Sequence, residues 1–318
     1  MRSVMNRRRF LSGSAAVVGS TLASVGSADE KNEMNCLRWC EQFRQLLLKN
    51  AGIHDVYMFP NLASKHIAVA WEQLHSTWDV NEKYSITGPV NRCQLQLYDA
   101  MGSLDGHPDF SVQQIIDEGI HRGAEQKDQN DFSTDIASNV RSVLSLRQTD
   151  PLNYFPSDRT IQRSTYDKSI LTRANTIGTY SILGWHGSSR LRVAQGRTKL
   201  IHGEDPVIKN KADAIATSSG SSQSDIDEWV LKRREDYVVG MADAMDQKIL
   251  HVIYGCAHNW VDNIAQLRKL FTLLVVRPKE VVAWRKSHPD HFLGYDVSGN
   301  FLQKGAIPWQ LEAGMPRP

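Results

Sequence analysis

The hydrophobic pattern of this chain changes several times between helical periodicity and short apolar runs. The apolar, β-branched runs 249–254 and 271–276 predict buried strands, and shorter strand patterns occur at 84–87, 112–116 and 199–201. Helices are predicted between them, at 91–101, 131–146, 164–195, 225–247 and 261–269. Strands that alternate with helices indicate an α/β fold, with a mostly parallel central sheet flanked by helices.

The segment before these strands has a more helical pattern. It reads as helices separated by the short apolar piece 56–58, with a second helix from Asn61 to about Gln73. The expected organisation is therefore a signal at 1–28, an N-terminal helical segment at 29–80, an α/β domain at 81–287 with a helical insertion at about 120–195, and a C-terminal tail at 288–318.

The first residues have the pattern of an export signal. Arg7-Arg8-Arg9-Phe10-Leu11 is followed by a mildly apolar, uncharged run and then by the small residues Gly26-Ser27-Ala28. This order is typical of a bacterial twin-arginine signal that is cleaved after Ala28. An uncleaved anchor is the alternative, but the run is short and rich in Ser and Gly for a span of about 20 residues. We expect the twin-arginine translocase as a partner, no stable membrane span after cleavage, and a soluble periplasmic or extracellular protein.

Composition and charge exclude several other classes of protein. Hydrophobic residues make up 41% of the chain and charged residues 23%, which is unlike a disordered protein. The net charge of +2 depends on the signal, because removal of residues 1–28 leaves 33 basic and 35 acidic residues. A nucleic-acid partner is therefore not expected. The motifs of serine hydrolases, zincins, P-loop NTPases and dinucleotide-binding proteins are missing from the sequence.

The four cysteines give no evidence of a zinc site or a disulfide framework. Cys36 and Cys40 are four residues apart in a helical pattern, and Cys93 and Cys256 stand alone. Zinc needs more ligands than one such pair offers. Buried free thiols are expected at all four positions.

Residues with catalytic potential fall where the predicted strands end. They are Gly88–Asn91, Glu118, Glu204 and Gly255–His258. Ligands of open α/β sheets bind outside the carboxyl ends of the strands. These four groups are therefore expected to meet at one edge of the sheet.

Arg234 gives a second, independent argument for a site. It lies in the apolar stripe of the predicted 225–247 helix, four residues from both Val230 and Val238. A buried arginine needs an anionic partner, and Glu118 and Glu204 are the natural candidates. The alternative is that Arg234 extends its aliphatic stem to the surface.

In this order, the motifs resemble those of the TraB/Tiki/ChaN-like superfamily, which also includes erythromycin esterases. The family pattern has a strand ending in Gly-x-x-His, a strand ending in Glu-Gly, an arginine on a late helix, and a second strand-terminal Gly-x-x-His. The corresponding residues here are Gly88-Pro-Val-Asn91, Glu118-Gly119, Arg234 and Gly255-Cys-Ala-His258. The resemblance covers roughly residues 83–276, and residues 184–205 are similar to the ChaN-like branch.

One position departs from the family pattern, because Asn91 stands where the family has histidine. A carboxamide is a weak metal ligand and cannot act as a base. The histidines that could replace the missing ring are His54, His121 and His186. His66 and His75 are expected to be ordinary residues of a helix and its packing rather than ligands.

The resemblance implies an exported metal-dependent hydrolase that cleaves a peptide, ester or similar bond of an unidentified substrate. Its divalent metal would be held by His258, Glu118 and Glu204, and Arg234 would stabilise a developing negative charge. Glu118, Arg234 and His258 would carry catalysis, and the remaining site positions would be Gly88, Asn91 and Gly255.

Two other functions on the same fold are consistent with the resemblance. One is a non-catalytic binding protein for haem, iron or another ligand, and the other is a degenerate scaffold. Asn91 favours these alternatives, whereas Glu118, Arg234 and His258 favour the hydrolase. The sequence leaves open whether the chain is an enzyme; a divalent metal is the first expected cofactor and haem the second.

Overall fold

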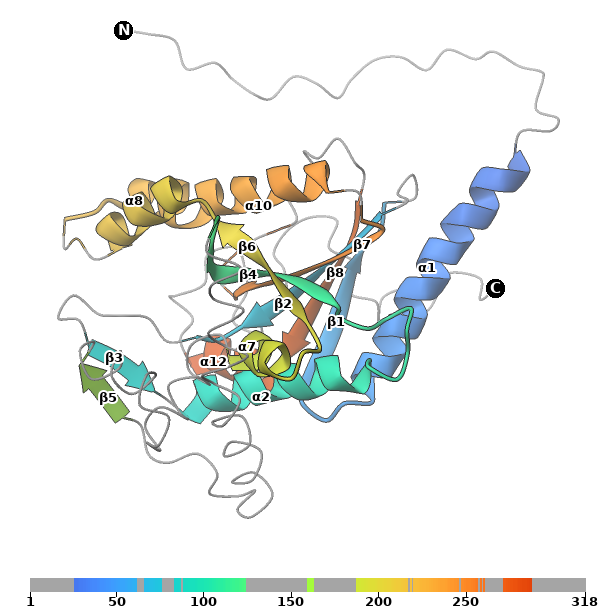
Figure 1. Ribbon diagram of the computed structural model, residues 1–318, viewed down its shortest axis with the longest axis horizontal. Helices are drawn as coiled ribbons and strands as arrows, with labels where there is room; N and C mark the ends of the chain where they lie inside the picture. Colours follow the sequence, from blue (N-terminus) through green and yellow to red (C-terminus); the bar gives the residue numbers. More distant parts are fainter. Residues whose placement is uncertain are drawn as a thin grey trace, which may run out of the picture.

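A six-stranded sheet forms the centre of the computed structural model (Figure 1). The structure describes residues 26–61, 66–75, 83–86, 88–123, 159–162, 187–216, 218, 220–245, 247–256, 258, 260 and 271–287. Its helices are α1 (Gly26–Leu48), α2 (Gly88–Ser103), α7 (Gly187–Ala194), α8 (Pro206–Ala216), α9 (Gln223–Asp225), η1 (Ile226–Lys232), α10 (Arg233–Ala244) and α12 (Lys279–Ser287). Its strands are β1 (Ile53–Phe59), β2 (His66–Gln73), β3 (Lys83–Ile86), β4 (Gln114–His121), β5 (Arg159–Gln162), β6 (Lys199–Glu204), β7 (Ile249–Gly255) and β8 (Phe271–Pro278).

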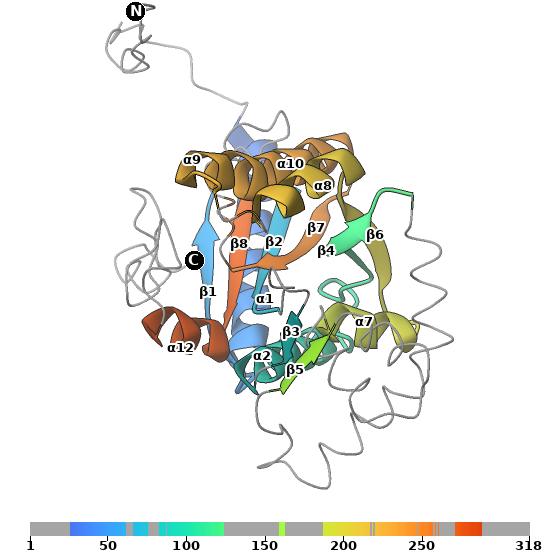
Figure 2. The same cartoon turned by 90° about the vertical axis from the view of Figure 1, so that its left-hand side faces the viewer.

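The strand order of the main sheet is β1-β8-β2-β7-β4-β6, as Figure 2 shows from one side. β1 pairs antiparallel with β8, and every other pairing in this sheet is parallel. The prediction of an α/β fold with a mostly parallel sheet is therefore confirmed.

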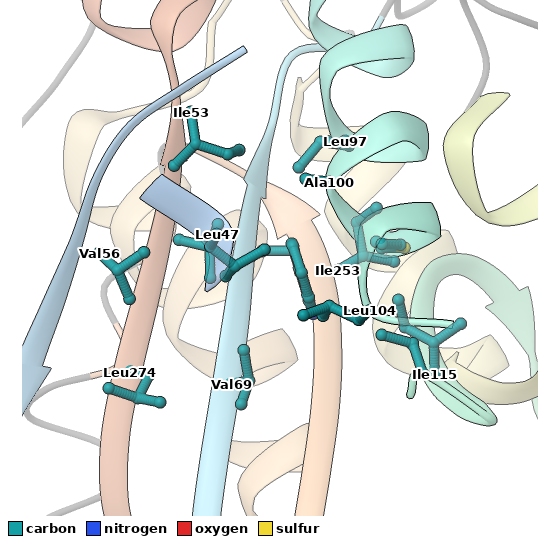
Figure 3. Packing of buried hydrophobic residues seen from close by; sticks show 14 of the residues in the cluster. Leu47, Ile53, Val56, Val69, Leu97, Ala100, Leu104, Ile115, Ile253 and Leu274 are labelled. Atoms are coloured by element: carbon teal, nitrogen blue, oxygen red, sulfur yellow. The ribbon is translucent and has the colours of Figure 1, made fainter. Parts of the chain in front are cut away.

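Helices cover both faces of the sheet. On one face, α1, α2, α7 and α12 bury an apolar layer against the strands, and α10 packs on the other face. Figure 3 shows the first layer, with Leu47 of α1, Val69 of β2 and Leu97 of α2 among its buried side chains. Strands covered on both faces are typical of parallel sheets.

The helix predicted from Asn61 to about Gln73 is wrong. His66–Gln73 is the strand β2, which lies between β7 and β8, and seven of its eight residues are buried. A strand that is buried on both faces reads as a continuous apolar run without a period of two. Among the described residues of the 29–80 segment, helix therefore occurs only in α1, and β1 and β2 belong to the sheet.

The strand predicted at 84–87 forms outside the main sheet. It is β3, which pairs antiparallel with β5 in a separate two-stranded sheet. Gly88 then begins α2, so Gly88–Asn91 does not follow a strand of the main sheet. The expectation that this motif ends a central strand is wrong, because β2 takes that place.

Other predicted elements are present or lie outside the described residues. β7 and β8 match the predicted apolar runs, and 187–194 is a helix as expected from the pattern of 164–195. The remaining predictions, at 1–25, 131–146, 164–186, 261–269 and 288–318, lie outside the described residues. Cleavage after Ala28 would remove the first three residues of α1. None of the helices in the described part of the chain is long and apolar enough to cross a membrane.

Candidate functional site

The site residues lie where four parallel strands of the sheet end. His75 follows β2, Gly255 ends β7, Glu118 lies near the end of β4, and Glu204 is the last residue of β6. α10 packs over this side of the sheet and brings in Arg234 and Glu235, and His258 follows β7. The strand-end groups predicted from the sequence therefore do meet, with the exception of Gly88–Asn91.

Arg234 joins two carboxylates from two strands. Its Nη2 donates to Glu118 Oε1 at 2.6 Å and also to Glu204 Oε1, and its Nε lies 3.1 Å and 3.2 Å from the two oxygens of Glu204. Nη1 donates to the carbonyl of Val230 at 3.2 Å. Although burial opposes the charge, Glu118 and Glu204 raise the pKa of Arg234 well above its usual value. The predicted partnership of Arg234 with these two acids is present.

A π-helical segment sets the start of α10. In η1 the Arg233 backbone N–H donates to Glu228 O, five residues back, before regular helix begins. π-turns are rare and often lie at functional sites. Here the segment ends just before Arg234, whose side chain is 9% exposed, whereas that of Arg233 is 51% exposed.

The turn after Glu204 is fixed by a helix cap. Asp205 Oδ1 accepts from the N–H groups of Val207 at 2.9 Å and Ile208 at 3.2 Å. Pro206 is the first residue of α8, a position where its missing N–H costs no helical hydrogen bond. Burial raises the pKa of Glu204 despite the neighbouring guanidinium of Arg234.

Glu118 lies between two histidines, and both oxygens of its carboxylate have polar contacts. Its Oε2 is 3.1 Å from His75 Nε2 and accepts from the Gly255 N–H at 2.6 Å. Its Oε1 is 3.6 Å from His258 Nε2, in addition to the contact with Arg234. Burial alone would raise the pKa of Glu118, but His75 and Arg234 outweigh it and hold this pKa well below its usual value. Glu118 is therefore a buried carboxylate at neutral pH.

An irregularity in β4 lies where Asp117 and Glu118 contact different helices. The pairing of β4 with β6 shifts register between Asp117 and His121, and such bulges re-aim side chains. Asp117 accepts a hydrogen bond from the Ser189 hydroxyl of α7, whereas Glu118 contacts α10. Burial raises the pKa of Asp117 to about 6. Two consecutive carboxyls thus have pKa values displaced in opposite directions.

His258 is held by two carboxylates and two rings. Its Nδ1 is 3.0 Å from Glu235 Oε1, its Nε2 faces Glu118, and its ring contacts Tyr254 edge-on at 4.9 Å and Trp260 at 5.9 Å. Burial lowers the pKa of His258, but Glu118 and Glu235 outweigh burial and raise it. This environment favours the charged imidazolium.

His75 is the site residue that the sequence argument missed. Gln73 of β2 pairs with Gly255 of β7, so His75 and His258 follow the ends of adjacent strands. The prediction of an ordinary packing residue depended on a helix at 61–73, and that helix is wrong; His75 instead follows β2 and contacts Glu118. The signal was present as a histidine just after a buried apolar run. The His75 side chain is 17% exposed, whereas that of His258 is 3% exposed.

Asn91 is not part of this network. It lies in the first turn of α2, is 1% exposed, and makes no described contact with Glu118, Arg234 or His258. Its Oδ1 is buried without a hydrogen-bond partner among the described residues. Of the three histidines named as possible replacements for the missing ring, His54 is exposed on β1. The side chain of His121 and all of His186 lie outside the described residues.

The donor set does not fit a divalent metal at this position. Within the described ranges, no group of three or more His, Cys, Asp and Glu residues is arranged to hold a metal ion. Two of the three predicted ligands, Glu118 and Glu204, are bound by Arg234, and a cation on the same oxygens would lie beside its guanidinium. The residues therefore form an ion-pair network, and the metal held by His258, Glu118 and Glu204 stays a prediction without support from this geometry.

A second ionic cluster lies next to this network. Arg277 Nε donates to Glu72 Oε2 at 2.6 Å, and Arg285 Nη2 donates to Glu72 Oε1 at 3.0 Å and to the Cys256 carbonyl at 2.5 Å. The guanidinium of Arg277 also lies 4.6 Å from the centre of the Tyr57 ring. Burial opposes the charge of Glu72, but Arg277 and Arg285 lower its pKa. Arg285 thereby holds the turn between Gly255 and His258.

No family model, curated protein or solved structure matches this chain. The resemblance to the TraB/Tiki/ChaN-like superfamily therefore stays a prediction that depends on the sequence motifs alone.

Proposed function

We propose that this chain is a hydrolase that cleaves an ester or peptide-type bond of a small substrate by acid–base catalysis. His75 is the base and Glu118 is its carboxylate partner. The observation that carries this proposal is the 3.1 Å contact between His75 Nε2 and Glu118 Oε2, at the end of parallel strands where α/β enzymes bind their ligands. The motif resemblance, which includes esterases, points to the same class of reaction.

His75 is the group that meets the substrate, because its side chain is the most exposed of those around Glu118. Its neutral ring takes a proton from a water molecule as the water oxygen attacks the carbonyl carbon. The imidazolium then returns this proton to the leaving oxygen or nitrogen. Glu118 fixes the ring and stabilises its charged form, as the carboxylate does in other acid–base dyads.

The buried residues support Glu118 rather than touch the substrate. Arg234 directs its donors to Glu118, Glu204 and Val230, which favours a supporting role over the predicted role on developing substrate charge. His258, paired with Glu235, adds positive charge beside Glu118. Together these groups keep Glu118 ionised, which is the state the base requires of its partner.

The test measures hydrolysis of p-nitrophenyl esters and peptide p-nitroanilides by the full chain. His75→Ala is expected to lower kcat/KM by at least about 100-fold, the usual contribution of a positioned base. His66→Ala is the matched control, since His66 is the first residue of β2, the strand that His75 follows, and its Nδ1 is 2.9 Å from the Gln247 carbonyl. Absence of turnover, or equal loss in both variants, would overturn the proposal.

Asn91→His separates this proposal from the degenerate-scaffold alternative. Because the described contacts of Asn91 do not include the network, the substitution is expected to leave hydrolysis unchanged. A gain of hydrolysis would favour a site that Asn91 had disabled. In a parallel titration with haem, a Soret band that is lost in His75→Ala would favour ligand binding instead.

Export is the second part of the proposal. The Arg7-Arg8-Arg9-Phe10-Leu11 motif and the small residues up to Ala28 support passage through the twin-arginine translocase. Replacement of Arg7 and Arg8 by Lys is expected to retain the chain in the cytoplasm of a bacterial host. Cell fractionation measures this, and undiminished export of the double variant would contradict it.

A further inference from the structure

A polar cavity lies where β4 and β7 begin, at the opposite edge of the sheet from the proposed active site. Its volume is about 300 Å³, which is at the lower end of the range for small-molecule pockets. The loop before β4 and the first residues of β4 and β7 line it. The polar groups in this lining include Asp109, Gln113, Gln114, Gln247, Lys248 and His251.

His251 is the most buried polar residue of this lining, with 6% of its surface exposed. The indole Nε1 of Trp71 donates to His251 Nδ1 at 3.2 Å. Because an indole N–H can only donate, Nδ1 is the unprotonated nitrogen, and the neutral ring has its proton on Nε2. Burial also lowers the pKa of His251 to about 3, so the ring is neutral at physiological pH.

The Nε2–H group of His251 is available to a ligand. It has no hydrogen-bond partner among the described residues, and it is not one of the buried atoms that are enclosed without a partner. It is therefore open to the cavity that His251 lines. The rings of Phe43 and Trp71, with centres 6.4 Å and 6.1 Å from that of His251, hold the imidazole in place. The cavity thus contains one fixed, uncharged donor.

Amide side chains nearer the surface add further donors and acceptors. Gln247 Nε2 donates to Gln114 Oε1 at 2.6 Å, which joins the first residue of β4 to the segment just before β7. This bond leaves the NH₂ group of Gln114 and the side-chain carbonyl of Gln247 for a ligand. The described lining also contains one acid, Asp109, and one base, Lys248, and both are exposed. Their charges cancel, so the cavity has no net charge.

We propose that this cavity binds a small uncharged compound with several hydroxyl groups, such as a monosaccharide. A hydroxyl group both donates and accepts, so it can pair with the N–H of His251 and with the amides of Gln114 and Gln247. An anion would instead place its charge against a neutral donor, and a charge buried without a counter-charge is costly.

The position of the cavity separates it from the proposed chemistry. Gln114 and Ile249 are the first residues of β4 and β7, whereas Glu118 and Gly255 lie near or at the ends of the same strands. A compound in the cavity would therefore not occupy the place of the substrate. The inference does not depend on the proposed hydrolase.

The experiment applies saturation-transfer NMR to the full chain with D-glucose, D-galactose, D-ribose and myo-inositol, and with glycine and acetate as charged probes. Calorimetry then gives the Kd of the neutral probe with the strongest signal. We expect one site per chain, with no competition from glycine or acetate. Gln114→Ala is expected to weaken binding by about 5–10-fold, the usual worth of one neutral hydrogen bond. Gln195→Ala is the matched control, since this exposed amide accepts from the Tyr98 hydroxyl outside the cavity.

The donor of His251 has its own readout in the unmodified chain, which avoids a substitution next to Trp71. The Nε2–H resonance of His251, recorded by ¹H–¹⁵N NMR of the imidazole ring, should shift when the neutral probe saturates the cavity. Three results would overturn the inference: no binding of any of the four neutral probes, displacement of the bound probe by glycine or acetate, and equal affinity of Gln114→Ala and Gln195→Ala. A His251 resonance that stays in place at saturation would also overturn it, because the probe would then bind elsewhere.

Discussion

Two buried ionic clusters lie on strands on either side of β7 and have opposite proportions of charge. In one, Arg234 is shared by Glu118 and Glu204. In the other, a single carboxylate, Glu72, is shared by two arginines. The first cluster has surplus negative charge and the second has surplus positive charge.

The surplus decides what each cluster can do. The carboxylate-rich cluster is balanced by His75 and His258, whose Nε2 atoms lie 3.1 Å and 3.6 Å from Glu118. Histidine is the side chain best suited to exchange a proton near neutral pH. The cluster of Glu72, Arg277 and Arg285 contains no histidine, and it holds the carbonyl of the turn after β7. Buried ion pairs perturb pKa values in both cases, so perturbed values alone do not identify a catalytic site. The proposed catalytic role depends instead on the histidines beside the surplus acid.

Arg234→Met should have the largest effect on stability. It leaves Glu118 and Glu204 buried without their common cation, which costs about 3–5 kcal/mol in the free energy of unfolding. Urea denaturation measures the loss. Arg233→Met is the matched control, because the pair of Arg233 with Glu228 is exposed and is worth at most about 1 kcal/mol. Equal losses in the two variants would mean that Arg234 is not the support of the carboxylate-rich cluster.

Glu72→Gln tests the other cluster. Loss of the carboxylate leaves two buried guanidinium groups facing an amide, at a cost of about 3 kcal/mol. The pH dependence of hydrolysis should keep its shape at temperatures where the variant is folded, because His75 and Glu118 keep their contacts. A shifted pH profile would show that the two clusters act as one unit.

Asp117→Asn tests whether the negative charge of the buried carboxyl next to Glu118 lowers the stability of the fold. The pKa of Asp117 is raised in the folded chain from 3.8 to about 6, so the folded state binds the proton more tightly. Stability from this group is present below pH 3.8 and is lost as the pH rises through about 6. At pH 8 the variant should be more stable by about 2–3 kcal/mol, and at pH 3.5 the difference should vanish. Chemical denaturation at both pH values measures this; a variant that is less stable at pH 8 would contradict it.

Part of this site was predictable from the sequence. Arg234 lay within an apolar stripe, and a buried guanidinium requires acids, so Glu118 and Glu204 could be named as partners before the fold was known. Gly255 and His258 followed from the apolar run of β7. These predictions succeeded because each depended on a local pattern and a strong physical requirement.

The rest depended on tertiary context. β2 has no alternation because both of its faces are buried, so its sequence alone does not distinguish it from a helix or indicate a role for His75. Arginine side chains usually lie at the protein surface, yet Arg277 is 0% exposed and Arg285 is 1% exposed. Only the packing of β8 and α12 against Glu72 brings these charges together. The sequence pattern likewise gave no sign of the register shift in β4 or of the π-turns of η1.

Tyr254→Phe should have the smallest measurable effect on stability. It tests whether Tyr254 only stabilises the carboxylate-rich cluster or also takes part in hydrolysis. The Tyr254 hydroxyl donates to the Gly203 carbonyl, which links β7 to β6 next to Glu204. Its loss leaves a buried carbonyl with one partner fewer, a cost of about 1–2 kcal/mol. The ring that contacts His258 is retained, so hydrolysis should be unchanged.

Tyr98→Phe is the control. It removes an exposed hydrogen bond to Gln195 and should change stability by less than about 0.5 kcal/mol. Tyr254→Phe could instead lower hydrolysis as much as His75→Ala does and leave stability unaffected. The phenol would then take part in the reaction, and the assignment of His75 and Glu118 as a pair that acts without it would be wrong.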